Sequence, residues 1–438
     1  DKICSFCNLN RKQIDNDLED YTNFLVSEFE KYGKTPYMKS KKINVILQPN
    51  ILFLLYMENH SLNFIDLFAG AGGLSEGFVQ AGYTPIAHIE MDRHACDTLK
   101  TRAAFHWLKA NNQLHKYKEY LYKKQEKEDG SKLWAQVPEE VINSVIQSEI
   151  GENTILNLFK QVDSLIKNKK IDLIIGGPPC QAYSIAGRAR LGKAVESDPR
   201  NDLYKYYVKF IEKYQPEMFV FENVLGIRTA KNGAPFQDLK KLIDEAGYIM
   251  EDHIELASEY GVLQNRQRVI IVGWKKGSPY KYPYLTKEVN KYEVLKDLFI
   301  DLPLRKHGEG ELCSPIKYTQ PLSKMKYLEE SGIRTNDFDF TTQHIARPNN
   351  KNDREIYRRA VELWLNERRR INYIELPSHL QKHKNKESFL NRFQVVDPYG
   401  YSHTVVAHIA MDGHYFIYPT LNPTIENVRS ITLREAAR

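Results

Sequence analysis

Short apolar runs alternate with helical patterns over the first part of the chain, and this alternation sets the predicted fold. The runs are rich in β-branched and aromatic residues and occupy positions 63–68, 86–90, 171–177, 218–224 and 269–274. Continuous apolar strands separated by helices are typical of a parallel sheet that is covered on both faces. The pattern predicts an α/β protein with a doubly wound, mostly parallel, Rossmann-like sheet over residues 60–275, with ligands bound beyond the carboxyl ends of the strands.

Two of the intervening segments have a clear apolar helical face. Leu74, Phe78 and Ala81 share one such face, and Gly82 follows as a predicted C-terminal cap. The pattern recurs before Gly247, at Leu239, Leu242, Ile243 and Ala246. We expect both faces to pack against the sheet and to take no part in chemistry.

Three regions depart from this pattern. Residues 1–60 form a polar, lysine-rich leader, and residues 101–170 contain a charged tract that predicts a solvent-exposed helical insertion. Over residues 276–428 the alternation stops, and Pro, Tyr, Asn, His and Arg become frequent. We therefore expect one sheet domain over residues 61–275, followed by a smaller irregular domain.

The composition favours a soluble, intracellular protein and excludes a membrane span. No segment approaches the roughly 18 consecutive apolar residues that a spanning helix requires. Five cysteines are too few and too scattered for a disulfide framework in a chain of 438 residues. Cys4 and Cys7 have the spacing of half a zinc site, but the chain has no second cysteine pair, so we predict no metal.

Positive charge is concentrated in the C-terminal part of the chain. Residues 275–438 contain 27 Lys and Arg against 20 Asp and Glu, whereas residues 1–274 contain 35 against 36. A polyanion bound to the C-terminal part would release counterions, which favours binding. On charge alone, a nucleic acid partner and an ordinary lysine-rich surface are equally good explanations.

The first two predicted strands end in residues that suit a nucleotide-like ligand. The first strand leads into a glycine-rich loop with Phe68, Gly70, Gly72 and Gly73, where the backbone and the helix N-terminus can approach a ligand closely. The second strand ends at Glu90-Met91, about 20 residues further on, where a carboxylate can accept hydrogen bonds from ribose hydroxyls. These signals predict an adenosine-containing cofactor and leave a dinucleotide oxidoreductase open.

The third predicted strand ends in a loop that presents a thiol. Its sequence is Gly176-Gly-Pro-Pro-Cys-Gln-Ala-Tyr-Ser184, and the paired glycines and prolines do not suit core packing. A structural cysteine is usually buried among apolar residues, so Cys180 is the candidate nucleophile of the chain.

Four further elements follow in order, and together they resemble the bacterial DNA (cytosine-5) methyltransferase family. They are Asp198-Pro-Arg-Asn-Asp-Leu203, Phe221-Glu-Asn-Val224, Gln264-Asn-Arg-Gln-Arg268 and Arg429-Ser-Ile-Thr-Leu-Arg-Glu-Ala-Ala-Arg438. The resemblance implies a catalytic domain over residues 61–275, a target-recognition domain over 276–428, and a segment at 429–438 that returns to the catalytic domain. The family's closing Gly-Asn-Ala/Ser-Val segment is not present, so we expect an incomplete version of a longer protein.

The resemblance assigns a role to each matching residue. Cys180 attacks carbon 6 of cytosine, Glu222 donates a proton to N3, Arg266 holds O2, and Arg268 supports the loop or a phosphate. The predicted contacts to S-adenosylmethionine, which leaves as S-adenosylhomocysteine, are Phe68, Gly70, Gly72, Gly73, Glu90, Met91, Pro179, Leu203 and Asn223, with Glu149 as a candidate for the adenine amino group. The predicted contacts to DNA are Gln181, Ser184, Arg188, Arg190, Lys193 and Thr404, with Arg347 and Arg392 as further candidates.

The predicted activity is methylation of carbon 5 of a flipped-out cytosine in a specific double-stranded DNA sequence. The resemblance implies a bacterial cytoplasmic, nucleoid-associated enzyme that acts as a monomer, with a possible cognate restriction endonuclease. Two alternatives stay open at this point. The same catalytic residues would serve an RNA cytosine-5 methyltransferase, and the chain could be a catalytically impaired DNA-binding homologue.

Overall fold

The computed structural model describes residues 62–122, 130–179, 199–288, 291–311, 314–406 and 413–438. These residues form two compact units. The sheet unit contains the described residues up to 107, together with 134–255 and 267–287. The irregular unit contains residues 108–133, 256–266 and 288–438, as far as they are described.

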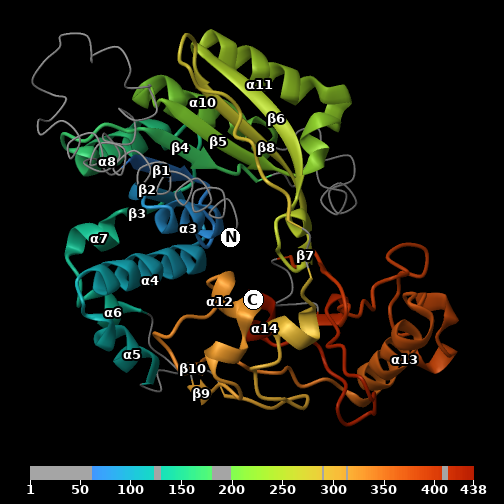
Figure 1. Ribbon diagram of the computed structural model, residues 1–438. Coiled ribbons are helices and arrows are strands. Elements are labelled where there is room, and N and C mark those ends of the chain that lie inside the picture. The colour runs from blue at the N-terminus through green and yellow to red at the C-terminus, as the bar shows by residue number, and fades with distance from the viewer. Residues whose placement is uncertain (1–61, 123–129, 180–198, 289–290, 312–313, 407–412) are drawn as a thin grey trace, which may run out of the picture. The chain divides into compact units, whose positions relative to one another are not determined.

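The sheet unit is built on one seven-stranded sheet with the order β3-β2-β1-β4-β5-β8-β6 (Figure 1). Neighbouring strands from β3 to β5 pair in parallel, whereas β8 is antiparallel to β5. The strands are β1 (Asn63–Leu67), β2 (Thr84–Glu90), β3 (Val145–Gln147), β4 (Leu173–Gly176), β5 (Met218–Asn223), β6 (Tyr248–Leu256) and β8 (Gln267–Lys275). The predicted doubly wound, mostly parallel sheet is confirmed, and its strand order reverses between β1 and β4, where ligands of such sheets bind.

Alternate strand residues bury opposite faces of this sheet. Phe64 packs with Phe78 of the helix α3 on one face, whereas Ile65 belongs to the larger cluster on the other face, with Tyr207 and Leu239. The helices that follow the strands are α3 (Gly73–Gln80), α4 (Arg93–Ala110), α8 (Ile155–Ile166), α10 (Leu203–Tyr214) and α11 (Ala234–Glu245), with the short α7 (Glu139–Asn143). The short α6 (Ser131–Trp134) belongs to the irregular unit except for its last residue. The two predicted apolar helical faces are therefore core-facing, as expected.

Two strands of the sheet are absent from the set predicted from apolar runs. β3 is three residues long, too short to show a pattern. β6 lies at the edge of the sheet, and only its first residue, Tyr248, is buried. β3 and α8 both lie within residues 101–170, and α8 buries Ile155, Leu158 and Val162 in the core. Part of the segment expected as an insertion thus completes the sheet unit.

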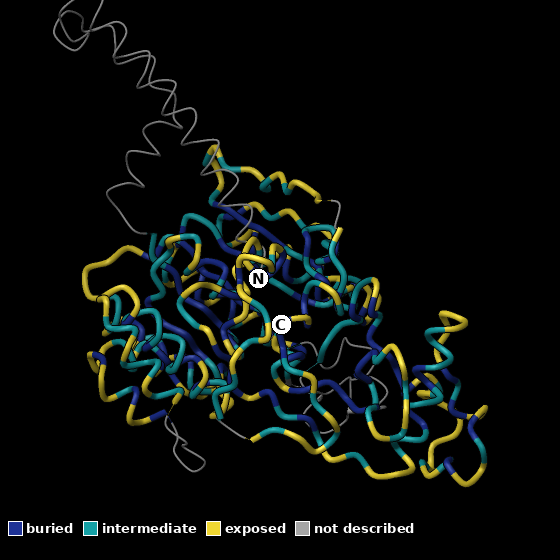
Figure 2. Tube along the Cα trace, turned by 60° about the horizontal axis from the view of Figure 1, so that its bottom comes forward, coloured by how far each residue is buried: buried dark blue, intermediate teal, exposed yellow. Residues whose placement is uncertain are grey.

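The irregular unit has little regular structure and two apolar cores. One core joins α13 (Lys351–Glu367) to Phe393 and Ile417, and the other joins Leu263 and Leu298 to Phe416. Figure 2 shows buried stretches of the described chain interrupted by exposed ones. Its other elements are α5 (Leu114–Tyr122), α12 (Lys326–Glu330), α14 (Leu433–Ala437) and the strands β7 (Gln264–Asn265), β9 (Ile316–Lys317), β10 (Phe340–Thr341) and β11 (Ser402–His403).

The final segment of the chain is fixed within the irregular unit. Arg429 forms two 2.7 Å hydrogen bonds to the carboxylate of Glu435, and both side chains are buried. Thr432 and Glu435 form a reciprocal capping box that starts α14. Within the described part of the chain, no helix has the length and apolar character to cross a membrane.

Candidate active site

The loop after β1 is held by the carboxylate that ends β2. Glu90 accepts a 2.8 Å hydrogen bond from Gly70 N through Oε2, and bonds of 2.9 and 2.8 Å from Met91 N and Asp92 N through Oε1. Gly70 and Gly72 have φ angles of 54° and 81°, in the left-handed region that favours glycine. Glu90 therefore connects the glycine loop to the start of α4, and it does so at the predicted cofactor site.

A charged cluster fixes α3, which follows the glycine loop, against α4. Glu76 accepts from Arg102 at 2.6 Å and pairs with His106 Nε2 at 2.9 Å. Burial raises the pKa of Glu76, but the hydrogen bond to His106 and the charge of Arg102 outweigh it and lower the pKa to about 2. Sequence reasoning did not predict this cluster, because its only sequence signal is one acidic residue in the first turn of α3.

The loop after β4 packs closely against its neighbours because it begins with glycine. A Cβ at Gly176 would lie 2.5 Å from Leu67 O, and a Cβ at Gly177 would lie 3.0 Å from Glu222 Oε2. Asn223 is buried and donates from Nδ2 to Pro178 O at 3.3 Å. The end of β5 thus positions the backbone that leads into Cys180, which itself lies outside the described residues.

Glu222 and Arg268 form an ion pair at the end of β5. Arg268 Nε donates to Glu222 Oε1 at 2.8 Å, and the two side chains are 19% and 27% exposed. Antiparallel pairing of β5 with β8 brings them together, because Glu222 lies opposite Ile270 in the register. Sequence reasoning predicted both residues for the site, but it did not predict their contact across 46 positions.

The remaining predicted cofactor residues lie at the same edge of the sheet. Phe68 has a φ of 55° directly after β1, and Leu203 begins α10. Met91 is 62% exposed. Glu149 is exposed two positions after β3, so the parallel pairing of β3 with β2 puts it at the same strand ends as Glu90. The carboxyl ends of β1, β2, β3, β4 and β5 therefore gather most of the predicted residues.

Arg266 and Thr404 come together in the irregular unit. β7 pairs in parallel with β11, and Thr404 Oγ1 donates to Asn265 O at 2.8 Å, directly before Arg266. Local sequence patterns do not predict this pairing, because the two bonded residues are 139 positions apart. The predicted DNA contacts Gln181, Ser184, Arg188, Arg190 and Lys193 lie outside the described residues.

The structure contradicts the prediction that Arg392 contacts DNA. Its guanidinium donates to Phe389 O, Asn385 O and Ser388 O at 2.9, 2.9 and 3.0 Å, and it lies 4.4 Å from the ring centre of Tyr373. The residue is 7% exposed. A buried guanidinium that donates three hydrogen bonds to backbone carbonyls holds a loop and does not reach a base.

Comparison with known proteins decides the family. The family model for C-5 cytosine-specific DNA methylase matches residues 62–129 and 136–438. The chain belongs to this family. A Type II methyltransferase of Bacillus paralicheniformis, M.Bpa9945I, is 39% identical over 406 residues, which cover 85% of this chain and 89% of the relative. M1.HphI of Haemophilus parahaemolyticus is 28% identical and covers 65% of this chain and 66% of its own length.

A solved structure supports the fold of this C-5 cytosine DNA methyltransferase. A DNA modification methyltransferase encoded within an E. coli prophage covers 86% of this chain and 87% of its own, with a TM-score of 0.53 and 23% identity. The family membership excludes the dinucleotide oxidoreductase that the glycine loop and Glu90 alone had left open as an alternative. It also favours DNA over RNA as the substrate class.

Proposed function

We propose that this enzyme transfers a methyl group from S-adenosylmethionine to carbon 5 of a flipped-out cytosine, through a covalent bond between Cys180 and carbon 6. The observation that carries the proposal is the convergence of Glu90, Glu222 and the Gly177–Pro179 loop at the carboxyl ends of neighbouring strands. Cys180 follows Pro179 directly in the chain.

The residues present suit the proposed methyl donor. Two glycines with positive φ open the backbone after β1, and Glu90 and Glu149 place carboxylates after β2 and β3. Carboxylates at these strand ends suit the ribose hydroxyls and the adenine amino group, both of which are hydrogen-bond donors. S-adenosylmethionine supplies an activated methyl group when it is bound.

The proposed chemistry begins with electron release into the ring. The Cys180 thiolate forms a bond to carbon 6, and Glu222 gives a proton to N3, so that carbon 5 gains nucleophilic character. Carbon 5 takes the methyl group and S-adenosylhomocysteine leaves. A base then removes the carbon 5 proton, the sulfur–carbon bond breaks to release the thiolate, and the N3 proton returns to Glu222, so that the aromatic ring and the enzyme are both restored.

The ion pair at the end of β5 positions the Glu222 carboxyl group for this step. Arg268 holds Oε1, while Gly177 leaves room for Oε2 beside the loop. A side chain at position 177 would push the carboxylate and the Cys180 loop apart. Positioning within a fraction of an ångström is worth orders of magnitude in rate.

The irregular unit is proposed to select the DNA sequence, with Thr404, which follows β11, as one contact to DNA. Arg266, which follows β7, is proposed to hold O2 of the cytosine. The relatives are named Type II methyltransferases, which supports a role in restriction and modification. A cognate endonuclease, action as a monomer and a location with the bacterial nucleoid are further parts of the proposal.

Sequencing of methylated cytosines tests this function. Duplex DNA treated with the protein and S-adenosylmethionine should gain 5-methylcytosine at one short sequence, and a Cys180→Ser variant should add none. Methylation of RNA in place of duplex DNA, or binding of DNA without methyl transfer, would replace this proposal by one of the two alternatives.

A further inference from the structure

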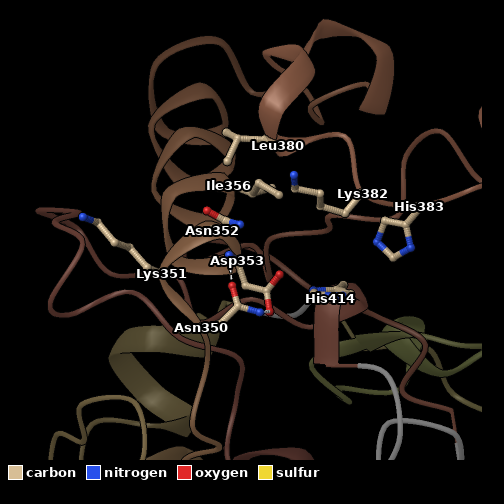
Figure 3. A pocket seen from close by; sticks show the side chains of 9 residues that line it. All are labelled: Asn350, Lys351, Asn352, Asp353, Ile356, Leu380, Lys382, His383 and His414. Carbon is tan, nitrogen blue, oxygen red and sulfur yellow. Dashed lines mark hydrogen bonds between the residues drawn. The ribbon is translucent and has the colours of Figure 1, made fainter.

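A cavity of about 530 Å³ lies in the irregular unit at the start of α13. Asn350, Asn352 and Asp353 border it from the helix, and Lys382, His383 and His414 border it from two later segments (Figure 3). None of the residues predicted for cofactor or base binding lines it. The cavity thus has no part in the site described above.

A lysine ammonium group, amides and imidazoles line the cavity, and His414 Nδ1 is already hydrogen-bonded to the Tyr357 hydroxyl at 2.7 Å. Lys382, Asn352 and the two imidazoles surround the space, while the side chain of Lys351 extends away from them (Figure 3). The single carboxylate, Asp353, accepts from Asn350 Nδ2 at 2.6 Å. Across the described parts of the chain, no carboxylate lies within ion-pair distance of the Lys382 ammonium group. The cavity therefore suits an anion.

Buried side chains hold the basic segment that forms one wall. The segment is Lys-His-Lys-Asn-Lys at positions 382–386. Its three lysines are all exposed, and Lys384 and Lys386 lie outside the cavity lining. The Tyr373 hydroxyl accepts from His383 N at 2.6 Å, and Arg392 binds the carbonyl of Asn385. The lysines are thus presented on a fixed backbone.

We propose that this cavity binds a phosphodiester of the DNA backbone outside the sequence that is read. This inference rests on the proposed function, because it takes duplex DNA as the substrate. The exposed lysines that continue from the cavity favour a polyanion over a single small anion, since each further phosphate finds a further ammonium group. The apolar side chains of Ile356 and Leu380 line the same cavity and suit the adjoining sugar.

Phosphate ethylation interference tests the inference in the full chain. With the natural protein, ethylation of one or two phosphates outside the methylated sequence should weaken binding, and with Lys382→Gln the same ethylations should have no effect. Loss of one phosphate contact should also lower the slope of log affinity against log salt by about one unit for every target sequence. Lys384→Gln removes the same charge outside the cavity and should leave these phosphates sensitive.

Three results would overturn the inference. The first is an interference pattern in Lys382→Gln that equals that of the natural protein. The second is an equal change of the pattern in Lys382→Gln and Lys384→Gln. The third is binding of inorganic phosphate that depends on Lys382 while the interference pattern on DNA does not. An equal melting temperature for both variants checks folding, and Lys382→Arg should restore the interference. Trapping on 5-fluorocytosine DNA, which reports on the catalytic residues, keeps a failure here distinct from a failure of the proposed function.

Discussion

The sheet unit and the irregular unit hold their polar loops in different ways. In the sheet unit the strands satisfy most backbone groups, and a few carboxylate and amide side chains, such as Glu90 and Asn223, fix the loops at the strand ends. In the irregular unit buried arginines fix the loops instead, since each guanidinium offers five hydrogen-bond donors to backbone carbonyls that are not paired in a sheet. Arg392 binds three carbonyls, and Arg429 binds Arg305 O and Ser430 O as well as Glu435.

This difference changes the meaning of the positive charge in the C-terminal part. The surplus of Lys and Arg left a polyanion-binding surface and an ordinary solvated surface equally open, but Arg334, Arg392 and Arg429 are at most 8% exposed. Arg334 and Arg438 share the buried carboxylate of Asp301. Part of the basic surplus therefore stabilises an irregular fold, and the exposed lysines are the better evidence for a nucleic acid surface.

The largest expected effect comes from breaking an arginine pair in the irregular unit. Arg429→Ala leaves Glu435 buried without its partner, which should cost about 3–5 kcal/mol of the unit's unfolding free energy. Denaturant unfolding followed by tryptophan fluorescence measures the loss. Lys326→Ala, which breaks the exposed pair with Glu330, should change the unfolding free energy little. Equal losses in the two variants would contradict the structural role of the buried arginines.

The next effect is expected in the sheet unit, at the proton donor. Glu222→Gln should lower kcat by about 100- to 1,000-fold, because the amide cannot transfer a proton to N3. Affinity for duplex DNA should stay within about twofold, since phosphate contacts supply most of it. Glu217→Gln alters a carboxylate at the other end of β5 and should leave kcat unchanged. A normal kcat in Glu222→Gln would remove this residue from the chemistry.

A smaller effect is expected where the loop after β4 meets Glu222. Gly177→Ala places a methyl group 3.0 Å from Glu222 Oε2, so kcat should fall about 100-fold while cofactor affinity is preserved. Gly151→Ala adds the same group where nothing lies within 4 Å and serves as the control. Equal activity of the two variants in a methylation assay would show that the close approach has no catalytic consequence.

The smallest effect concerns the cofactor loop. Glu90→Ala removes the acceptor of three backbone bonds and a proposed ribose contact, so affinity for S-adenosylmethionine should fall by about 1–3 kcal/mol. Titration calorimetry measures this directly, with Glu152→Ala as an exposed control. Unchanged affinity would exclude Glu90 from the cofactor site.

The sequence predicted the parts of the fold that rest on local pattern. Apolar runs located β1, β2, β4, β5 and β8, and spaced apolar residues located the buried faces of α3 and α11. Contacts between distant segments could not be predicted in this way. The pairing of β7 with β11 and the bond between Arg268 and Glu222 depend on tertiary structure, and the arginines of the irregular unit carry no signal that separates interior from surface.

The central claim is that Cys180 forms a covalent bond to carbon 6 of the target cytosine, and trapping on 5-fluorocytosine DNA tests it most directly. Fluorine at carbon 5 cannot leave as a proton does, so the intermediate cannot break down after methyl transfer. The account predicts an adduct that requires S-adenosylmethionine, survives denaturing electrophoresis and maps by mass spectrometry to Cys180. An adduct at another cysteine, or efficient methylation by a Cys180→Ala variant, would contradict it.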